Sequence, residues 1–421
     1  MHHLLRRLAW LLPLLAMAAC GGGEDRTKAH VRLVNATSGY STLQLQVGDS
    51  NVGGAAAYGA NEGYADVDKG TADASVSRPG SATVLSTTSV SLGKNSYYTM
   101  LAYGKAGQLA TLLVDENEPE AADGKAKVRV VNAAPDAGDV DLFITASGDT
   151  LDDSSAALAG QAYGKLSGFA TINSGTWRVR VTAAGDKTDV RLDVGGVVFA
   201  GKGVSTLVVT PGRGGVLVNG LQLVQAGGVA RQDNAQARVR AVAGLAGGTF
   251  SVSVAGQALV SDLVSPVQTD YSLVAAGTVA VAASAGGQAA ALTSTTLAGG
   301  GDYTLLVYGT AAAPVAVLVE DDNTRPTGST KSRVRLVHAV ADVSGPLALT
   351  IAQKSIVSGV AQGAGSAYVE ITSTTKADVG VSGNGTTLFT AVDQPFNGNG
   401  NYTVFAVGTA AATSAIVNQD R

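Results

Sequence analysis

Apolar and polar residues alternate along most of the chain after residue 20. Strict alternation runs through Leu43–Val47, Trp177–Thr182 and Phe250–Val254. Because successive side chains of a β-strand point to opposite faces, each run predicts a strand with one buried face and one solvated face. Gly and Asn clusters interrupt the runs about every eight to twelve residues, and no long stretch has the period of an amphipathic helix. The pattern therefore predicts an all-β fold.

Two short phrases recur along the chain. The first, Val-Arg followed by two further residues, opens at Val31, Val128, Val239 and Val334. The second, which begins with Tyr-Thr, opens at Tyr98, Tyr303 and Tyr402, with a degenerate version at Ser205–Thr210. A period of about one hundred residues suits a small independent domain better than a solenoid repeat. With roughly seven strands per repeat, we expect four tandem immunoglobulin-like domains, each an antiparallel β-sandwich. Their expected ranges are 31–119, 128–225, 238–324 and 333–421.

The first 20 residues have the features of a bacterial lipoprotein signal. A basic start precedes an uncharged apolar run, Leu8–Ala19, that is too short to span a bilayer as a helix. The segment Met17–Cys20 then resembles a lipobox, in which the cysteine thiol is diacylated and becomes the new N-terminus. We therefore expect a signal peptide over residues 1–19, a palmitate-type lipid on Cys20, and a flexible tether over residues 20–30.

Cys20 is the only cysteine in the chain, so disulfides cannot hold the fold together and hydrophobic burial must do so. The alternative is an ordinary secretory signal that leaves a free thiol, which would be a liability in an exported protein. By resemblance to sorted lipoproteins, Gly21 implies delivery to the outer membrane of a Gram-negative cell, on its periplasmic or its surface face. Two or more acyl chains would anchor the protein stably.

The composition favours ordered domains over disorder, with 45% hydrophobic and 15% charged residues. The formal net charge is −4, and removal of the signal, with Arg6 and Arg7, makes it more negative by two. This mild acidity argues against nucleic acid as a partner.

One stretch carries a family resemblance. Val128–Leu142, which reads Val-Arg-Val-Val-Asn-Ala-Ala-Pro-Asp-Ala-Gly-Asp-Val-Asp-Leu, closely resembles the opening of the bacterial domain of unknown function family numbered 4397. The first and fourth repeats follow it more loosely, at Val31–Thr37 and Val334–Val340. The third repeat departs most, because Gly244-Leu245-Ala246 replaces the Asn-Ala-Pro-Asp turn. The resemblance implies a fold and export, and it implies no activity or catalytic residues.

Catalytic chemistry has few candidate residues. Once the signal is removed only His30 and His338 remain, and both lie in the entrance to a repeat's first strand. A nucleophilic triad or a histidine-based zinc site would need one of them, so both kinds of site are disfavoured. Gly196–Gly203 matches a phosphate loop up to its lysine. It lacks the final Ser or Thr and no helix follows, so we interpret it as a hairpin turn.

Acidic residues are the other candidates for chemistry. The second repeat gathers Asp136, Asp139, Asp141, Asp152 and Asp153. A glycosidase acid pair and a calcium site are both conceivable there, but Asp136 follows a proline in a turn and two of the others alternate with apolar residues. We therefore favour structural roles for this cluster.

Two acidic runs lie between repeats. The first repeat ends with Asp115, Glu116 and Glu118, and the third ends with Glu320, Asp321 and Asp322. Each run follows the last apolar strand and is closed by a proline, and the middle linker, Gln225–Ala237, lacks the pattern. Calcium prefers six to eight oxygen ligands, which a junction of two domains could supply, so these six residues are candidate calcium ligands. The alternative is a solvated hinge whose charges discourage edge pairing.

Two further columns of residues recur. The second residue of the first phrase is Arg32, Arg129, Arg240 or Arg335, and alternation predicts that these side chains face solvent. They would form either a basic stripe for anionic glycans or lipid headgroups, or charges that keep an edge strand from aggregating; we favour the latter. The tyrosines that open the second phrase suit packing positions whose hydroxyls bond a neighbouring loop, with sugar stacking as the alternative.

Taken together, the sequence predicts a non-enzymatic envelope lipoprotein that serves as a structural, adhesive or binding array. Its partners would be the membrane, through the anchor, and an envelope protein or a glycan. A periplasmic or surface carbohydrate- or ligand-binding protein is the first alternative, and a hydrolase is the second.

Overall fold

The computed structural model describes residues 27–421, so the signal segment and Cys20 lie outside the described residues. The described chain forms β-strands arranged in eight sheets and four sandwiches, so the predicted all-β fold is confirmed. Within residues 27–421, no helix is long and apolar enough to cross a membrane.

The four sandwiches follow one another along the chain. Domain 1 contains β1 (Ala29–Asn35), β2 (Thr42–Val47), β3 (Ser50–Ala57), β4 (Ala65–Val67), β5 (Gly70–Ser77), β6 (Val84–Leu92), β7 (Tyr97–Lys105) and β8 (Gln108–Asp115). Domain 2 contains β9 (Lys125–Asn132), β10 (Val140–Thr145), β11 (Leu158–Gln161), β12 (Ala170–Asn173), β13 (Gly175–Ala183), β14 (Asp186–Phe199), β15 (Val204–Pro211), β16 (Val218–Val224) and β17 (Val229–Gln232). Domain 3 contains β18 (Gln236–Leu245), β19 (Thr249–Val254), β20 (Gln257–Val264), β21 (Val267–Gln268), β22 (Ser272–Ala275), β23 (Gly277–Ala285), β24 (Gln288–Ala289), β25 (Ser294–Leu297), β26 (Asp302–Thr310) and β27 (Ala313–Asp321). Domain 4 contains β28 (Lys331–Val340), β29 (Leu347–Ile351), β30 (Lys354–Val360), β31 (Val369–Thr372), β32 (Thr374–Gly383), β33 (Thr386–Phe396), β34 (Asn401–Thr409) and β35 (Ala412–Gln419).

Each domain packs an inner sheet against an outer sheet. The inner sheets have the strand orders β4-β1-β7-β8, β12-β9-β15-β16-β17, β21-β18-β26-β27 (with β22 also on β18) and β31-β28-β34-β35. The outer sheets are β3-β2-β5-β6, β11-β10-β13-β14, β20-β19-β23-β24 (with β25 also on β23) and β30-β29-β32-β33. Apolar side chains from both sheets fill the space between them, as the alternation predicts.

The inner sheets are mixed, which corrects the expectation of purely antiparallel sandwiches. The first strand of each domain pairs in parallel with the strand that carries the second phrase: β1 with β7, β9 with β15, β18 with β26 and β28 with β34. The chain leaves the inner sheet, builds the outer sheet and returns in its original direction, so the two inner strands run the same way. The two recurring phrases therefore lie side by side.

The Gly196–Gly203 segment comprises the end of β14 and a turn over residues 200–203, and this turn does not close a hairpin as expected. β14, before it, pairs with β13 in the outer sheet, whereas β15, after it, pairs with β9 and β16 in the inner sheet. The turn therefore carries the chain between the two layers of domain 2.

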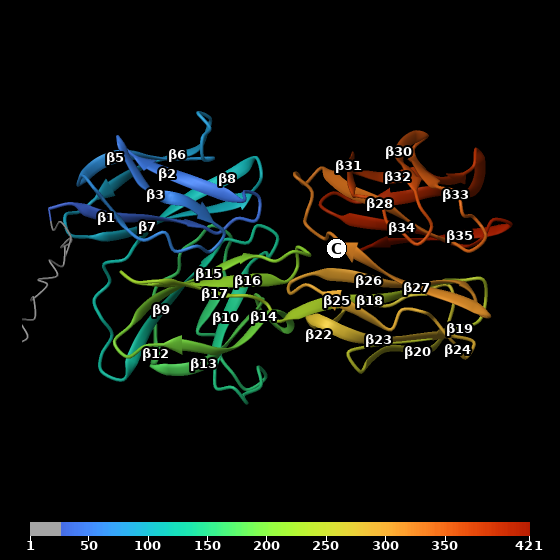
Figure 1. Cartoon of the computed structure of the whole chain (residues 1–421), viewed down its shortest axis with the longest axis horizontal. Coiled ribbons are helices and arrows are strands. Elements are labelled where there is room, and N and C mark those ends of the chain that lie inside the picture. The colour runs from blue at the N-terminus through green and yellow to red at the C-terminus, as the bar shows by residue number, and fades with distance from the viewer. Residues whose placement is uncertain (1–26) are drawn as a thin grey trace, which may run out of the picture.

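The domains associate in pairs through their inner sheets (Figure 1). Side chains on the faces of these sheets that point away from their own sandwich cores form one apolar cluster between domains 1 and 2 and another between domains 3 and 4. Val34 and Val131 belong to the first cluster, and Val242 and Val337 belong to the second. Each of these valines lies two residues after its column arginine, so the arginines share the same interdomain face.

The two pairs meet head to tail. We call the end that carries the β7–β8, β15–β16, β26–β27 and β34–β35 turns the tip of a pair, and the opposite end its base. The tip of domain 2 contacts the base of domain 3, where the amide of Gly214 donates to the carbonyl of Gly300 over 2.7 Å. The amide of Asn323 in turn donates to the carbonyl of Gly214 over 2.9 Å. The tip of the second pair is the far end of the molecule from β1 (Figure 1).

Candidate functional site

The four column arginines are buried, which corrects the expectation that they face solvent. Arg32, Arg129, Arg240 and Arg335 are between 0% and 8% exposed. Their strands lie in the interior of the inner sheets, with a neighbour on each side, so these strands are not edges. Alternation correctly placed the arginines opposite the sandwich core, but a second sheet covers that face. Neither a solvent-facing basic stripe nor an edge-protecting charge describes them.

A threonine from the parallel neighbour binds each arginine. The Nε atom of Arg32 donates to the Thr99 hydroxyl over 2.7 Å, and Arg335 donates to Thr403 over 2.9 Å. The equivalent bonds in domains 2 and 3 join Arg129 to Thr206 and Arg240 to Thr304. The register of the parallel pair places each arginine opposite its threonine, so the bond follows directly from the pairing of the two phrases.

An aromatic ring covers each guanidinium. The guanidinium carbon lies 4.6–4.7 Å from the ring centroid of Tyr64, Phe169, Tyr271 or Tyr368, one in each domain. A ring face attracts a cation and shields it from water, so the arrangement stabilises a buried charge. Sequence reasoning missed these aromatics because no repeated phrase surrounds them. Their common spacing of about thirty to forty residues after the arginine was the available signal.

An acidic side chain completes three of the four sites. On the next strand, one residue pairs with the column threonine, and the acidic residue lies two positions after that pairing residue. The acidic residues are Glu116, Asp321 and Asp420. Glu116 accepts from Arg32 over 2.9 Å, and Asp420 accepts from Arg240 over 2.5 Å. The equivalent position in domain 2 is Gln225, so that site carries no carboxylate of its own.

The arginines bind across the domain boundary. In the first pair, Arg32 donates to the carbonyl of Gly227 in domain 2 over 2.6 Å, and Arg129 donates to the carbonyl of Asp115 in domain 1. In the second pair the exchange is ionic, because Arg240 binds Asp420 of domain 4 and Arg335 binds Asp321 of domain 3.

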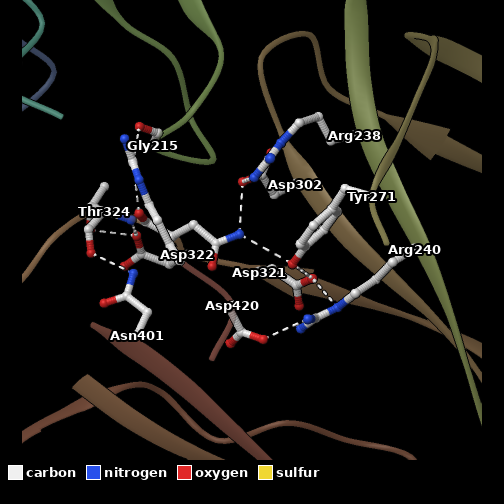
Figure 2. A network of polar contacts seen from close by, with 12 residues as sticks. Gly215, Arg238, Arg240, Tyr271, Asp302, Asp321, Asp322, Thr324, Asn401 and Asp420 are labelled. Atoms are coloured by element: carbon white, nitrogen blue, oxygen red, sulfur yellow. Dashed lines mark hydrogen bonds and ion pairs between the residues drawn. The ribbon is translucent and has the colours of Figure 1, made fainter. Parts of the chain in front are cut away.

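Figure 2 shows the network of the second pair, in which Arg240 reaches Asp420 on one side and Asp321 and Tyr271 on the other. The Tyr271 hydroxyl donates to Asp321 over 2.6 Å. Polar contacts of this kind are directional, so they fix how one sheet sits on the other, whereas the surrounding apolar contacts do not.

The ionisation of these groups depends on their neighbours. Burial acts to raise the pKa of Asp321, but Arg335 and Arg240 outweigh burial and hold it below its ordinary value. Burial acts to lower the pKa of Arg335, and the adjacent Asp321 reverses this and raises it. Arg129, at the site without its own carboxylate, has a pKa lowered by burial. Opposite charges therefore outweigh burial at Asp321 and Arg335 of the second pair but not at Arg129 of the first.

The six candidate calcium ligands have arginine or lysine partners, or bond within their own turn. Glu116 and Asp321 belong to the buried networks, Glu118 pairs with Lys127, Glu320 with Arg213 and Asp322 with Arg333. The Asp115 carboxylate accepts from Asn117 two residues away. Across residues 27–421, no three His, Cys, Asp or Glu side chains come close enough together to hold a metal ion. The structure thus gives these acidic runs cationic side chains as partners. The cation comes from the same domain for Glu116 and from another domain for Glu118, Glu320, Asp321 and Asp322.

Asp136 lies where three domains and a linker meet. Its carboxylate accepts from Lys105 of domain 1 over 2.9 Å and from the amide of Arg325 over 3.0 Å, and its carbonyl accepts from Arg421. Arg421 also donates to the carbonyl of Gly215 over 2.7 Å. Burial, with Arg325 nearby, lowers the pKa of Arg421 to about 10. The expected structural role of Asp136 in a turn therefore extends to joining the two pairs.

The tyrosine column behaves as predicted. The hydroxyls of Tyr98, Tyr303 and Tyr402 accept from the loop amides of Gly93, Ala298 and Asn397 over 2.7–3.0 Å, and all three side chains are buried.

The two histidines and Asp141 also contact loops or neighbouring strands. His338 bonds the carbonyl of Gly345, and His30 bonds the carboxylate of Asp66. The carboxylate of Asp141 accepts from the amides of Gly160 and Gly185. These groups hold loops in place.

The fold and its buried networks define a class: tandem β-sandwiches joined in pairs through arginines on their inner sheets. A family described as a domain of unknown function, DUF4397, matches residues 29–143 and 237–345, which together span more than half of the chain. The chain belongs to this family. Each match begins at the first strand of a pair, β1 or β18, and continues past its domain into the next. The third repeat is matched in full although its opening departs most from the phrase.

The other comparisons add little. No curated protein matches the chain. Among solved structures, the Bacillus anthracis TIE protein is 9% identical over 87% of this chain and 68% of that chain, with a TM-score of 0.15. A likeness at that level carries no argument about function.

Proposed function

We propose that this chain is a non-enzymatic, lipid-anchored envelope protein whose four sandwiches form a rigid spacer at the outer membrane. In this role the anchor is at Cys20, the first pair stands next to the membrane, and the second pair holds its tip away from it. The proposal rests on the lipobox-like segment Met17–Cys20 together with the arrangement of the domains.

One observation carries the proposal. The interfaces that join the domains contain buried ion pairs and apolar clusters instead of solvated linkers, and β1 begins at the opposite end from the free tip (Figure 1). The middle linker itself contains β17, which pairs with β16 and extends the inner sheet of domain 2. Interfaces of this kind keep the far end of the molecule at a fixed distance and orientation from its first strand, which is what a spacer requires.

The buried charges support a role without catalysis. A catalytic acid or base has to reach a substrate, whereas Glu116, Asp321 and Asp420 are held by arginines between two sheets. Their arrangement stabilises an interface, and it offers no open position beside a cleft for a reacting group.

The anchor is tested by metabolic labelling of the full chain with a clickable palmitate analogue. Wild-type protein should be labelled and processed, and Cys20→Ala should lose both. Equal labelling of the variant and the wild type would overturn the lipoprotein assignment. An epitope in the exposed turn after Thr310 should be accessible on intact cells if the array is displayed at the surface, and only after outer-membrane permeabilisation if it is periplasmic.

A further inference from the structure

Tyrosines close the domain 1–domain 2 interface near its tip. The hydroxyl of Tyr58, just after β3 in domain 1, lies 2.6 Å from the hydroxyl of Thr210 in domain 2. From the other side, Tyr163 of domain 2 packs edge-on against Tyr103 of domain 1, with ring centroids 5.6 Å apart. Each domain of the first pair therefore contributes one ring that covers the end of the facing inner sheet.

Domain 3 lacks the corresponding ring. In domain 2, the amide of Ser167, four residues after Tyr163, donates to the carbonyl of the residue that follows the column arginine. In domain 3 the amide of Thr269 makes this same bond, so the residue equivalent to Tyr163 and Tyr58 is Ser265. Ser265 is buried, and its hydroxyl donates to the carbonyl of Leu245. A small side chain thus stands where the other pair has an aromatic ring.

A groove of about 300 Å³ lies at this place, between domains 3 and 4. Its lining includes Leu245, Ala246, Ser265, Pro266, Val407 and Thr409, and none of its lining residues is charged. Val407 lies four residues after Thr403, just as Thr210 lies four residues after Thr206. Val407 therefore occupies the position that Thr210, the partner of Tyr58, holds in the first pair. The third repeat departs from the family phrase at Gly244-Leu245-Ala246, and two of these residues, Leu245 and Ala246, line the groove.

We propose that this groove is a docking site for a tyrosine side chain presented by an uncharged, extended segment of a partner polypeptide. The internal counterpart argues for that occupant, because Tyr58 fills the equivalent place in the first pair. An aromatic ring suits apolar walls, and a phenol hydroxyl finds partners in the hydroxyl groups at the rim. This inference rests on the proposed function and extends it, because it assigns a class of binding partner to the free tip of the spacer.

The charge distribution favours an uncharged partner. The tip of the first pair docks on the second through Arg213, which binds Glu320, and Lys105, which donates to the carbonyl of Arg325. The two hairpins at the free tip, over residues 303–319 and 402–419, contain no Asp, Glu, Lys or Arg. These hairpins therefore lack the cations with which the first pair binds a neighbouring sandwich, and the nearby carboxylate of Asp342 accepts from the amide of Ala410. A neutral segment meets the hairpins without burying an unpaired charge.

The probe for the test is the peptide Ala-Ala-Ala-Tyr-Gly-Ala-Asn, which is residues 55–61 of this chain. We would titrate it into the soluble protein, residues 27–421, and follow methyl NMR signals. Saturable shifts should be confined to methyl groups around the groove, such as those of Leu245 and Val407. The same peptide with alanine in place of tyrosine should produce none.

Two matched variants locate the binding. Ala412 lines the groove and is exposed at the start of β35, so Ala412→Glu should fold and weaken the peptide about tenfold or more by placing a charge at the rim. Ala313→Glu changes the equivalent exposed residue of the β26–β27 hairpin and should leave binding unchanged. Ser265→Tyr, which would refill the groove from within, should abolish binding in a protein that still folds.

Several results would overturn the proposal. These are the absence of saturable shifts up to the solubility of the peptide, equal weakening by both glutamate variants, or equally tight binding of N-acetyl-tyrosinamide, which would make the groove a small-molecule pocket. None of them would affect labelling at Cys20, so failure of the docking site is distinguishable from failure of the anchor.

Discussion

Removal of Arg335 should destabilise the second domain pair far more than removal of Arg129 destabilises the first. Both side chains are buried, donate to a threonine and lie beneath an aromatic ring. Their partners differ, because Arg335 neutralises the fully buried Asp321, whereas Arg129 donates to a backbone carbonyl. Substitution of each arginine by methionine keeps most of the side-chain volume and removes the charge.

The magnitudes follow from what each substitution leaves behind. Arg335→Met leaves Asp321 with only the more distant Arg240, at 3.6 Å, and two hydroxyl donors. Loss of one partner of a buried ion pair costs about 3–5 kcal/mol. Arg129→Met leaves no orphaned carboxylate, and the loss of its hydrogen bonds costs about 1–2 kcal/mol. For a unit the size of one pair, these values correspond to roughly 6–20 °C and roughly 2–8 °C in melting temperature.

Differential scanning calorimetry of the soluble protein, residues 27–421, would measure both shifts. The double variant Arg335→Met with Asp321→Asn should recover much of the loss, because it removes the orphaned charge along with its partner. Equal shifts for the two single variants, or no recovery in the double variant, would refute the reasoning that a buried, unpaired carboxylate causes the loss.

Two other predictions concern the junction and pH. An alanine at Gly214 would place its Cβ 2.5 Å from the Cγ atom of Asp302, so Gly214→Ala should open the head-to-tail junction and raise the maximum dimension in small-angle scattering. Gly148→Ala, where nothing lies within 4 Å, is the control and should leave that dimension unchanged. Burial acts to raise the pKa of Asp321 but Arg335 outweighs it, so the folded pKa lies below the unfolded one. The resulting stability is fully present above about pH 4 and is lost as the pH falls through the folded value. The melting temperature should therefore drop below pH 4, and Asp321→Asn should show a smaller drop; an unchanged pH profile would contradict this assignment.

Several features could be predicted from local sequence alone. The period-two alternation predicts strands, and the recurring phrases indicate that similar domains repeat. The tyrosine column could also be interpreted correctly, because each hydroxyl of Tyr98, Tyr303 and Tyr402 reaches a loop only five residues away. Interactions between neighbours in sequence depend little on how distant parts of the chain are arranged.

The arginine column shows where local pattern stops being informative. Alternation tells which residues share a face of a strand, and Arg32 indeed lies opposite Val31 and Leu33, which face the sandwich core. It does not tell whether solvent or another sheet covers the opposite face. That depends on the packing of domain against domain, and the same packing brings Arg335 of domain 4 onto Asp321 of domain 3.

The sequence by itself determined the all-β character of this protein, its repeats and the loops held by its tyrosines, because each depends on periodicity or on neighbours a few residues apart. Only the tertiary structure decided the parallel pairing of the two phrases, the burial of the arginines and the groove beside Ser265. Those features join residues that are tens to hundreds of positions apart. Their energies depend on which surfaces meet, and a single sequence does not specify which surfaces those are until the chain is folded.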